Sequence, residues 1–196
     1  MNPLEILTSR LRLLALTAES SAAAINNLAT FSSLLNAAIP SSWPPETLAD
    51  VQGLMAAKLS ERPDEAGWWG WYIIAKSGQV AESATLIGSA GCSRWGPDRV
   101  PHFGYGLLPE YFRRGFATEA ALALIDWVCR QPGVSQVHAT TFERHHASRK
   151  ILERCGFVNH GVSPDDATAA ESDRQGRGQL LLFKRDVIQG PSAHHA

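Results

Sequence analysis

The chain has 196 residues, of which 44% are hydrophobic, and a formal net charge of −1. A chain of this length can bury one good-sized core, so we expect a single domain over residues 1–187 and a flexible tail over 188–196. The small net charge, with a pI of about 6.6, argues against general attraction to nucleic acid or to an anionic membrane.

Cysteine usage and the N-terminus indicate a cytoplasmic protein. Cys92, Cys129 and Cys155 are widely spaced and form neither a disulfide framework nor a zinc-site pattern. The first residues lack the basic region and apolar core of a secretory signal, and no later apolar run approaches membrane-spanning length. We therefore expect reduced thiols and no bound metal.

The first half of the chain predicts a strand, helices and three more strands. Apolar periodicity and β-branched or aromatic content separate these elements, and Thr17 is a suitable helix N-cap. The expected elements are strand 8–16, helix 17–38 (or two helices with a kink), helix 47–59 and strands 68–75, 84–93 and 100–108. We expect Gly88 and Gly91 to relax the strand over 84–93.

The centre of the chain joins a strand end, a basic glycine loop and a helix start. Pro109 ends the strand because it has no N–H to donate, and an apolar stripe from Ala117 to Val128 predicts a helix. Between them, Gly115 can take a positive φ and present successive backbone N–H groups at the helix N-terminus. Such an arrangement binds phosphate, although a basic turn into an ordinary helix is the alternative interpretation.

The second half predicts three strands and one short helix. Gly156 stands where a left-handed C-cap would end that helix. The expected elements are strand 134–141, helix 147–155, a strand near 157–162 and strand 179–184. The polar stretch 163–178 is expected to be a loop.

The central junction resembles the acyl-CoA pyrophosphate motif of the GNAT superfamily of N-acetyltransferases, usually written Q/R-x-x-G-x-G/A. Here it reads Phe112-x-x-Gly115-x-Ala117, with Phe112 in place of Gln or Arg. The flanking PEY and TEA triplets, and the segment 147–157 with its serine and final Gly-Phe, resemble the branch containing the ribosomal-protein N-terminal acetyltransferases.

This resemblance implies an α/β (α+β) GNAT fold with a mixed, mainly antiparallel central sheet of about six to seven strands and helices on both faces. It also implies acetyl-CoA as the co-substrate. A backbone N–H near Leu107 or Leu108 would meet the thioester carbonyl. The expected phosphate-binding residues are Arg113, Arg114, Gly115, Phe116, Ala117 and Thr118.

Three side chains are candidates for proton transfer. His102 lies on the strand entering the junction, and an imidazole pKa near 6.5 suits a base, although packing beside Pro101 is the alternative. Ser148 matches the family serine that would protonate the leaving thiolate, and a helix N-cap is its alternative role. His145 stands where the family has Asn and is either an acid or a solvated loop residue.

The implied function is direct transfer of an acetyl group to a primary amine, with a protein or peptide N-terminus as the preferred acceptor. A small-molecule amine, such as a metabolite or antibiotic, stays open as acceptor. A CoA-binding regulatory module without turnover also stays open, because Phe112, His102 and His145 replace typical polar residues. The aromatic run 68–72 suggests an acceptor pocket, core packing or an exposed subunit contact, which leaves monomer or homodimer open.

Overall fold

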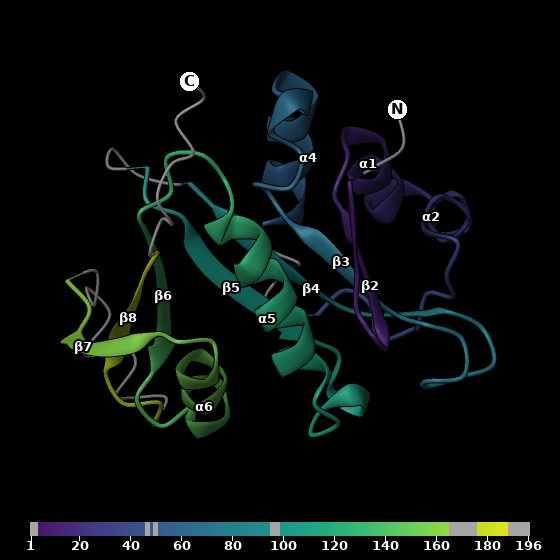
Figure 1. Ribbon diagram of the computed structural model, residues 1–196. Coiled ribbons are helices and arrows are strands. Elements are labelled where there is room, and N and C mark those ends of the chain that lie inside the picture. Colours follow the sequence, from purple (N-terminus) through teal and green to yellow (C-terminus); the bar gives the residue numbers. More distant parts are fainter. Residues whose placement is uncertain (1–3, 46–47, 49–50, 95–98, 165–175, 188–196) are drawn as a thin grey trace, which may run out of the picture. The chain divides into compact units, whose positions relative to one another are not determined.

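A computed structural model describes residues 4–45, 48, 51–94, 99–164 and 176–187 (Figure 1). The chain divides into two compact units, residues 1–93 with 104–124 and residues 94–103 with 125–196. The expected single domain over 1–187 stays a prediction. The expected tail over 188–196 and most of the 163–178 loop lie outside the described residues.

The first unit is built on antiparallel strands. β1 (Glu5–Leu7), β2 (Leu11–Ala15), β3 (Trp71–Ala75) and β4 (Thr85–Ser93) pair in chain order. β5 (His102–Leu107) follows β4 in the strand order and belongs partly to each unit. β1 is an additional edge strand that the sequence pattern did not reveal, because three residues are too few to show a period.

The helical segment after β2 breaks in two at Asn27. α1 (Ala18–Asn26) starts at Thr17, whose hydroxyl accepts from Ser20 N–H, so the expected N-cap is confirmed. α2 (Leu28–Leu35) follows at once, because extended Asn27 (φ −156°) ends α1 and its side chain accepts from Thr30 N–H at 3.0 Å. The helix expected over 47–59 is seen as α4 (Gln52–Glu61), with 46–47 and 49–50 outside the described residues.

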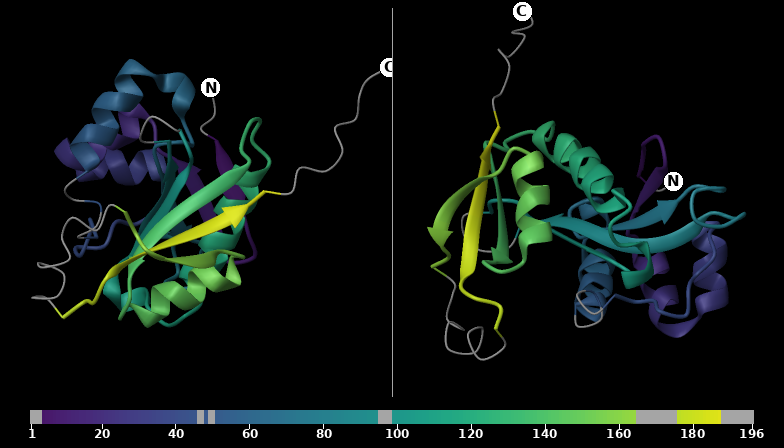
Figure 2. Two further views of the ribbon diagram at one scale, coloured as in Figure 1. Left: turned by 90° about the vertical axis from the view of Figure 1, so that its left-hand side faces the viewer. Right: turned by 90° about the horizontal axis from the view of Figure 1, so that it is seen from below.

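Helices cover both faces of the strands in the first unit (Figure 2, right). α1, α2 and α4 lie on one face, where Phe31, Trp43 and Tyr72 join their rings at centroid distances of 5.0 to 6.0 Å. The beginning of α5 (Phe116–Cys129) lies on the other face with its apolar side buried. Trp71 and Tyr72 have no exposed surface, so the expected exposed aromatic contact over 68–72 is wrong for these two rings.

Gly88 allows β4 and β5 to approach each other closely. A Cβ at this position would lie 2.3 Å from the carbonyl oxygen of Gly106 and 2.8 Å from the Cα of Leu107. The Leu108 N–H donates to the Ile87 carbonyl at 2.9 Å just beyond this contact. Gly88 also borders a register shift in the β3–β4 pairing, in agreement with its expected relaxing role, and its missing side chain in addition serves tight packing against β5.

The second unit continues with β6 (Gln136–Phe142), β8 (Leu180–Asp186) and β7 (Val158–Val162). Two residues of β5 pair in parallel with β6, as His102 with His138 and Phe103 with Ala139. β8 runs antiparallel to both β6 and β7. α6 (His146–Arg154) connects β6 to β7, and Cys155 and Gly156, at φ +80°, end this helix as expected.

The strand order β1-β2-β3-β4-β5-β6-β8-β7 is that of a mixed, mainly antiparallel sheet, as predicted. It has eight strands rather than six or seven, because β1 adds one. Among the described helices, none is both long and apolar enough to cross a membrane. The described residues also contain no cluster of His, Cys, Asp and Glu suited to a metal ion.

Candidate active site

The loop between β5 and α5 turns at two residues of left-handed conformation. After the short 3-10 turn Pro109–Tyr111, Arg113 has φ 59° and Gly115 has φ 80°. The Glu119 N–H then donates to the Gly115 carbonyl at 3.1 Å, which starts the hydrogen-bonding pattern of α5. The positive φ predicted for Gly115 is confirmed, and the alternation of conformations is typical of anion-binding backbone nests.

The backbone amides of this loop are available for an anion. Among the described residues, the six N–H groups of residues 113–118 donate to no acceptor. The amides on either side do donate, Phe112 N–H to the Pro109 carbonyl and Glu119 N–H to that of Gly115, each at 3.1 Å. Six consecutive donors at the positive end of a 14-residue helix therefore form a site suited to phosphate groups.

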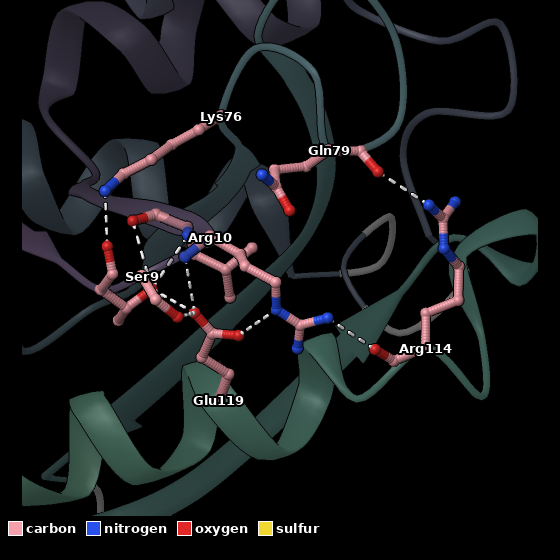
Figure 3. Close-up of polar contacts among 8 residues, drawn as sticks. Ser9, Arg10, Lys76, Gln79, Arg114 and Glu119 are labelled. Carbon is pink, nitrogen blue, oxygen red and sulfur yellow. Dashed lines mark hydrogen bonds and ion pairs between the residues drawn. The ribbon is translucent and has the colours of Figure 1, made fainter.

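Two arginines in this loop supply positive charge. Both Arg113 and Arg114 are exposed. The Arg114 guanidinium lies 5.2 Å from the centre of the Phe116 ring and donates to the Gln79 carbonyl at 2.8 Å (Figure 3). Phe112 is 54% exposed and offers no polar side-chain group, so the loop's polar donors come from the backbone and the arginines.

The two backbone amides proposed for a thioester carbonyl, those of Leu107 and Leu108, differ in their hydrogen bonding. The Leu108 N–H is already bonded to Ile87 of β4, so it does not fit the predicted role. Because successive N–H groups in a strand point to opposite edges, the Leu107 N–H points away from β4. Leu107 is therefore the better candidate of the pair.

His102 lies on β5 in the second unit and is half-buried. Its Nε2 is 3.3 Å from the hydroxyl of Thr140 on the paired strand β6. His145 lies before α6, where its Nδ1 is 3.5 Å from the hydroxyl of Thr141. Since neighbouring residues of a strand face opposite sides, the two histidines contact opposite faces of β6.

Ser148 is a buried residue of α6, 8% exposed. The N-cap of this helix is His145, without a side-chain capping bond, so the alternative of Ser148 as N-cap is wrong. Its hydroxyl makes no hydrogen bond among the described residues. Ser148 therefore has an unassigned hydroxyl, as a candidate proton donor requires.

The cysteines are poor candidates for a covalent intermediate. Cys92, Cys129 and Cys155 are free. Burial raises the pKa of Cys155 to about 11, although the nearby Arg185 opposes this shift. The Cys155 thiol is thus protonated at neutral pH, which favours direct transfer over a thioester on the protein.

Comparison with known proteins assigns the chain to a family. Residues 10–158 match the family model described as acetyltransferase (GNAT) domain. The chain belongs to the GNAT acetyltransferases. The resemblance to this superfamily is thereby confirmed.

The relatives are distant. The GNAT chain is 30% identical over 82 residues to YoaA, an uncharacterized N-acetyltransferase of Bacillus subtilis, and this match covers 41% of the chain and 46% of YoaA. A ribosomal-protein alanine acetyltransferase from Vibrio fischeri has a TM-score of 0.62 and 16% identity, with 95% of this chain and 98% of that one covered.

A second similar structure is RimL, a ribosomal alpha-N-protein acetyltransferase in complex with coenzyme A. Its TM-score is 0.60 at 14% identity, and the match covers 94% of this chain and 98% of that one. At such identities these structures show a shared fold.

Residues outside the predicted set also shape this GNAT site. Arg10 and Glu119 contact each other beside the 113–118 loop (Figure 3). The Glu119 of the TEA triplet was visible in the sequence as an acidic residue in the first helical turn. The pairing of Glu119 with Arg10 could not be predicted from the sequence, because 109 positions separate the two residues.

Proposed function

We propose that this protein transfers the acetyl group of acetyl-CoA directly to a primary amine, with the N-terminal amine of a protein or peptide as the acceptor. The observation that carries the proposal is the run of six unpaired amides over residues 113–118, at the segment that resembles the pyrophosphate motif of the GNAT family. The acceptor class is supported by two similar structures, which are those of ribosomal-protein acetyltransferases.

The chemistry needs an attacking amine, a donor to the carbonyl oxygen, a base for the amine proton and an acid for the leaving thiolate. The amine nitrogen attacks this carbon, forming the N–C bond as the C–S bond breaks and its electron pair leaves on sulfur. The Leu107 N–H stabilises the charge that develops on the carbonyl oxygen. His102 takes the proton lost by the amine, and Ser148, or alternatively His145, donates a proton to the thiolate.

Release of free CoA from acetyl-CoA tests this function. Purified protein is incubated with short peptides that have free N-termini, the same peptides with blocked N-termini, and small primary amines that include aminoglycosides. We expect release with the free peptides alone. Release with the small amines alone would assign the small-molecule alternative, and CoA binding without release in any well would favour the regulatory module.

The base role of His102 predicts a change in the pH profile. His102→Ala should lower kcat/KM at pH 7 by about a hundredfold and remove the limb of the pH–rate profile that reports the base. His138→Ala is the matched control, because His138 pairs with His102 across the two strands. An unchanged pH–rate profile in His102→Ala would dispose of the base role.

The acid role of Ser148 predicts a loss confined to turnover. Ser148→Ala should lower kcat by roughly tenfold or more while the KM for acetyl-CoA stays the same, because the hydroxyl acts on the leaving thiolate. Ser163→Ala, which removes another buried serine hydroxyl in the same unit, serves as the control. Full turnover in Ser148→Ala would show that this role is wrong.

A further inference from the structure

The turn between β1 and β2 holds both oxygens of the Glu119 carboxylate. Oε1 accepts from the Thr8 hydroxyl at 2.6 Å, the Ser9 hydroxyl at 3.0 Å and the Arg10 N–H at 2.9 Å. Oε2 accepts from Arg10 Nε at 2.7 Å (Figure 3). Burial opposes ionisation of Glu119, but these hydrogen bonds outweigh it and hold its pKa below the usual value. The carboxylate is thus ionised at neutral pH and anchors the start of α5 to this turn.

The Arg10 side chain also contacts the proposed acetyl-CoA loop itself. Its Nη1 donates to the Arg114 carbonyl at 2.9 Å, and its guanidinium carbon lies 4.6 Å from the centre of the Phe116 ring. A Cβ added to Gly115 would lie 3.2 Å from Arg10 Nη2. One guanidinium therefore contacts Arg114 and Phe116 and lies beside Gly115 while it is bound to Glu119.

A second connection supports the same arrangement. Arg114 donates to the Gln79 carbonyl at 2.8 Å, and Lys76 Nζ donates to the Thr8 carbonyl. The connection between β3 and β4 thus holds both the β1–β2 turn and the loop (Figure 3). These contacts come from segments far apart in the sequence.

Contacts from other segments are needed to hold the 113–118 loop in place, because its own backbone amides do not hold it. Its six amides form no internal hydrogen bonds among the described residues, and a non-glycine residue, Arg113, has a positive φ. A loop already held in its binding conformation loses less conformational freedom when a ligand binds. Support from Arg10 should therefore appear as affinity for the phosphates.

We propose that Arg10 is a positioning residue for acetyl-CoA binding, which joins Glu119 to the Arg114 carbonyl and holds the amides of residues 113–118 toward the pyrophosphate. This inference rests on the proposed function for its ligand. The role depends on the planar fork of arginine, because lysine keeps the charge but has no rigid pair of donors for two acceptors. Arg10→Lys therefore keeps the positive charge and removes the planar pair of donors, so it tests the contribution of the donors alone.

The test is calorimetric titration of CoA into the full chain. Arg10→Lys should weaken CoA binding on the order of tenfold, and Glu119→Gln should do the same from the helix side. Because the two residues act through one contact, the double variant should lose little more than either single variant. Arg130→Lys is the matched control, since it alters an exposed ion pair with Asp126 at the far end of α5 and should leave the affinity unchanged.

A role in general stability is separated by two readouts. The melting temperature of each free variant shows whether it is folded at the titration temperature, and steady-state kinetics should show a raised KM for acetyl-CoA with kcat nearly unchanged. Wild-type CoA affinity in Arg10→Lys would overturn the inference. If Arg10→Lys fails to fold, wild-type affinity in Glu119→Gln overturns it instead. A wild-type chain that binds no CoA would overturn the proposed function itself.

Discussion

Gly115→Glu is expected to abolish acetyl-CoA binding while the protein stays folded. Three effects combine at this position. Gly115 has φ 80°, which costs a residue with a side chain roughly 1–2 kcal/mol. The new Cβ would lie 3.2 Å from Arg10 Nη2 and disturb the fork that holds the loop. The added carboxylate would also repel the phosphates at the six amides, so we expect affinity to fall by about a hundredfold or more.

Gly133→Glu is the matched control for this substitution. Gly133 has φ 77°, and a Cβ there meets no atom within 4 Å, so the backbone strain and the added charge are alike. It lies after α5, outside the phosphate loop. Calorimetry should therefore show normal CoA affinity in Gly133→Glu and none in Gly115→Glu, with both variants folded by circular dichroism. Intact binding in Gly115→Glu would refute the cofactor assignment.

Gly88→Ala is expected to have the largest effect on stability. Its Cβ would lie 2.3 Å from the Gly106 carbonyl oxygen, a backbone atom that cannot rotate away. β4 and β5 would have to separate, so we expect a loss of about 3 kcal/mol, the upper end of typical overpacking costs. In a chain of this size this corresponds to a fall in melting temperature of about 6–12 °C. Thermal unfolding of the purified variant measures it.

The control for this second effect lies on the neighbouring strand. A Cβ at Gly104 of β5 meets no atom within 4 Å, so Gly104→Ala should unfold near the wild-type temperature. A melting temperature for Gly88→Ala within about 2 °C of Gly104→Ala, or less than 1 kcal/mol apart, would contradict the close packing of β4 and β5.

Local sequence signals predicted most elements of this fold. Thr17 offered its hydroxyl to the first turn of α1, and Gly115 could adopt a positive φ where the strand-to-helix loop required it. Asn27 was harder to foresee as a boundary, because the apolar stripe continues across it with nearly the same spacing. The helix period therefore predicted the helical segment, but it left open whether the segment is one helix or two and did not locate the break.

Contacts between distant residues were not predictable from the same signals. The sequence allowed Gly88 as a weak point in a strand, whereas the packed structure places it against Gly106 of the next strand. Arg10 looked like one basic residue in an apolar strand, and only the fold brings it to Glu119 and the Arg114 carbonyl. Such roles depend on which segments become neighbours, and one sequence does not encode that locally.

The most direct test of the central claim is a two-dimensional ¹⁵N NMR titration of the assigned protein with CoA. The claim is that the unpaired amides of residues 113–118 bind the phosphates. It predicts that these six amide signals shift strongly on binding, while that of Leu108, which is bonded to Ile87, changes little. Saturable CoA binding that leaves the amide signals of residues 113–118 unshifted would contradict this claim.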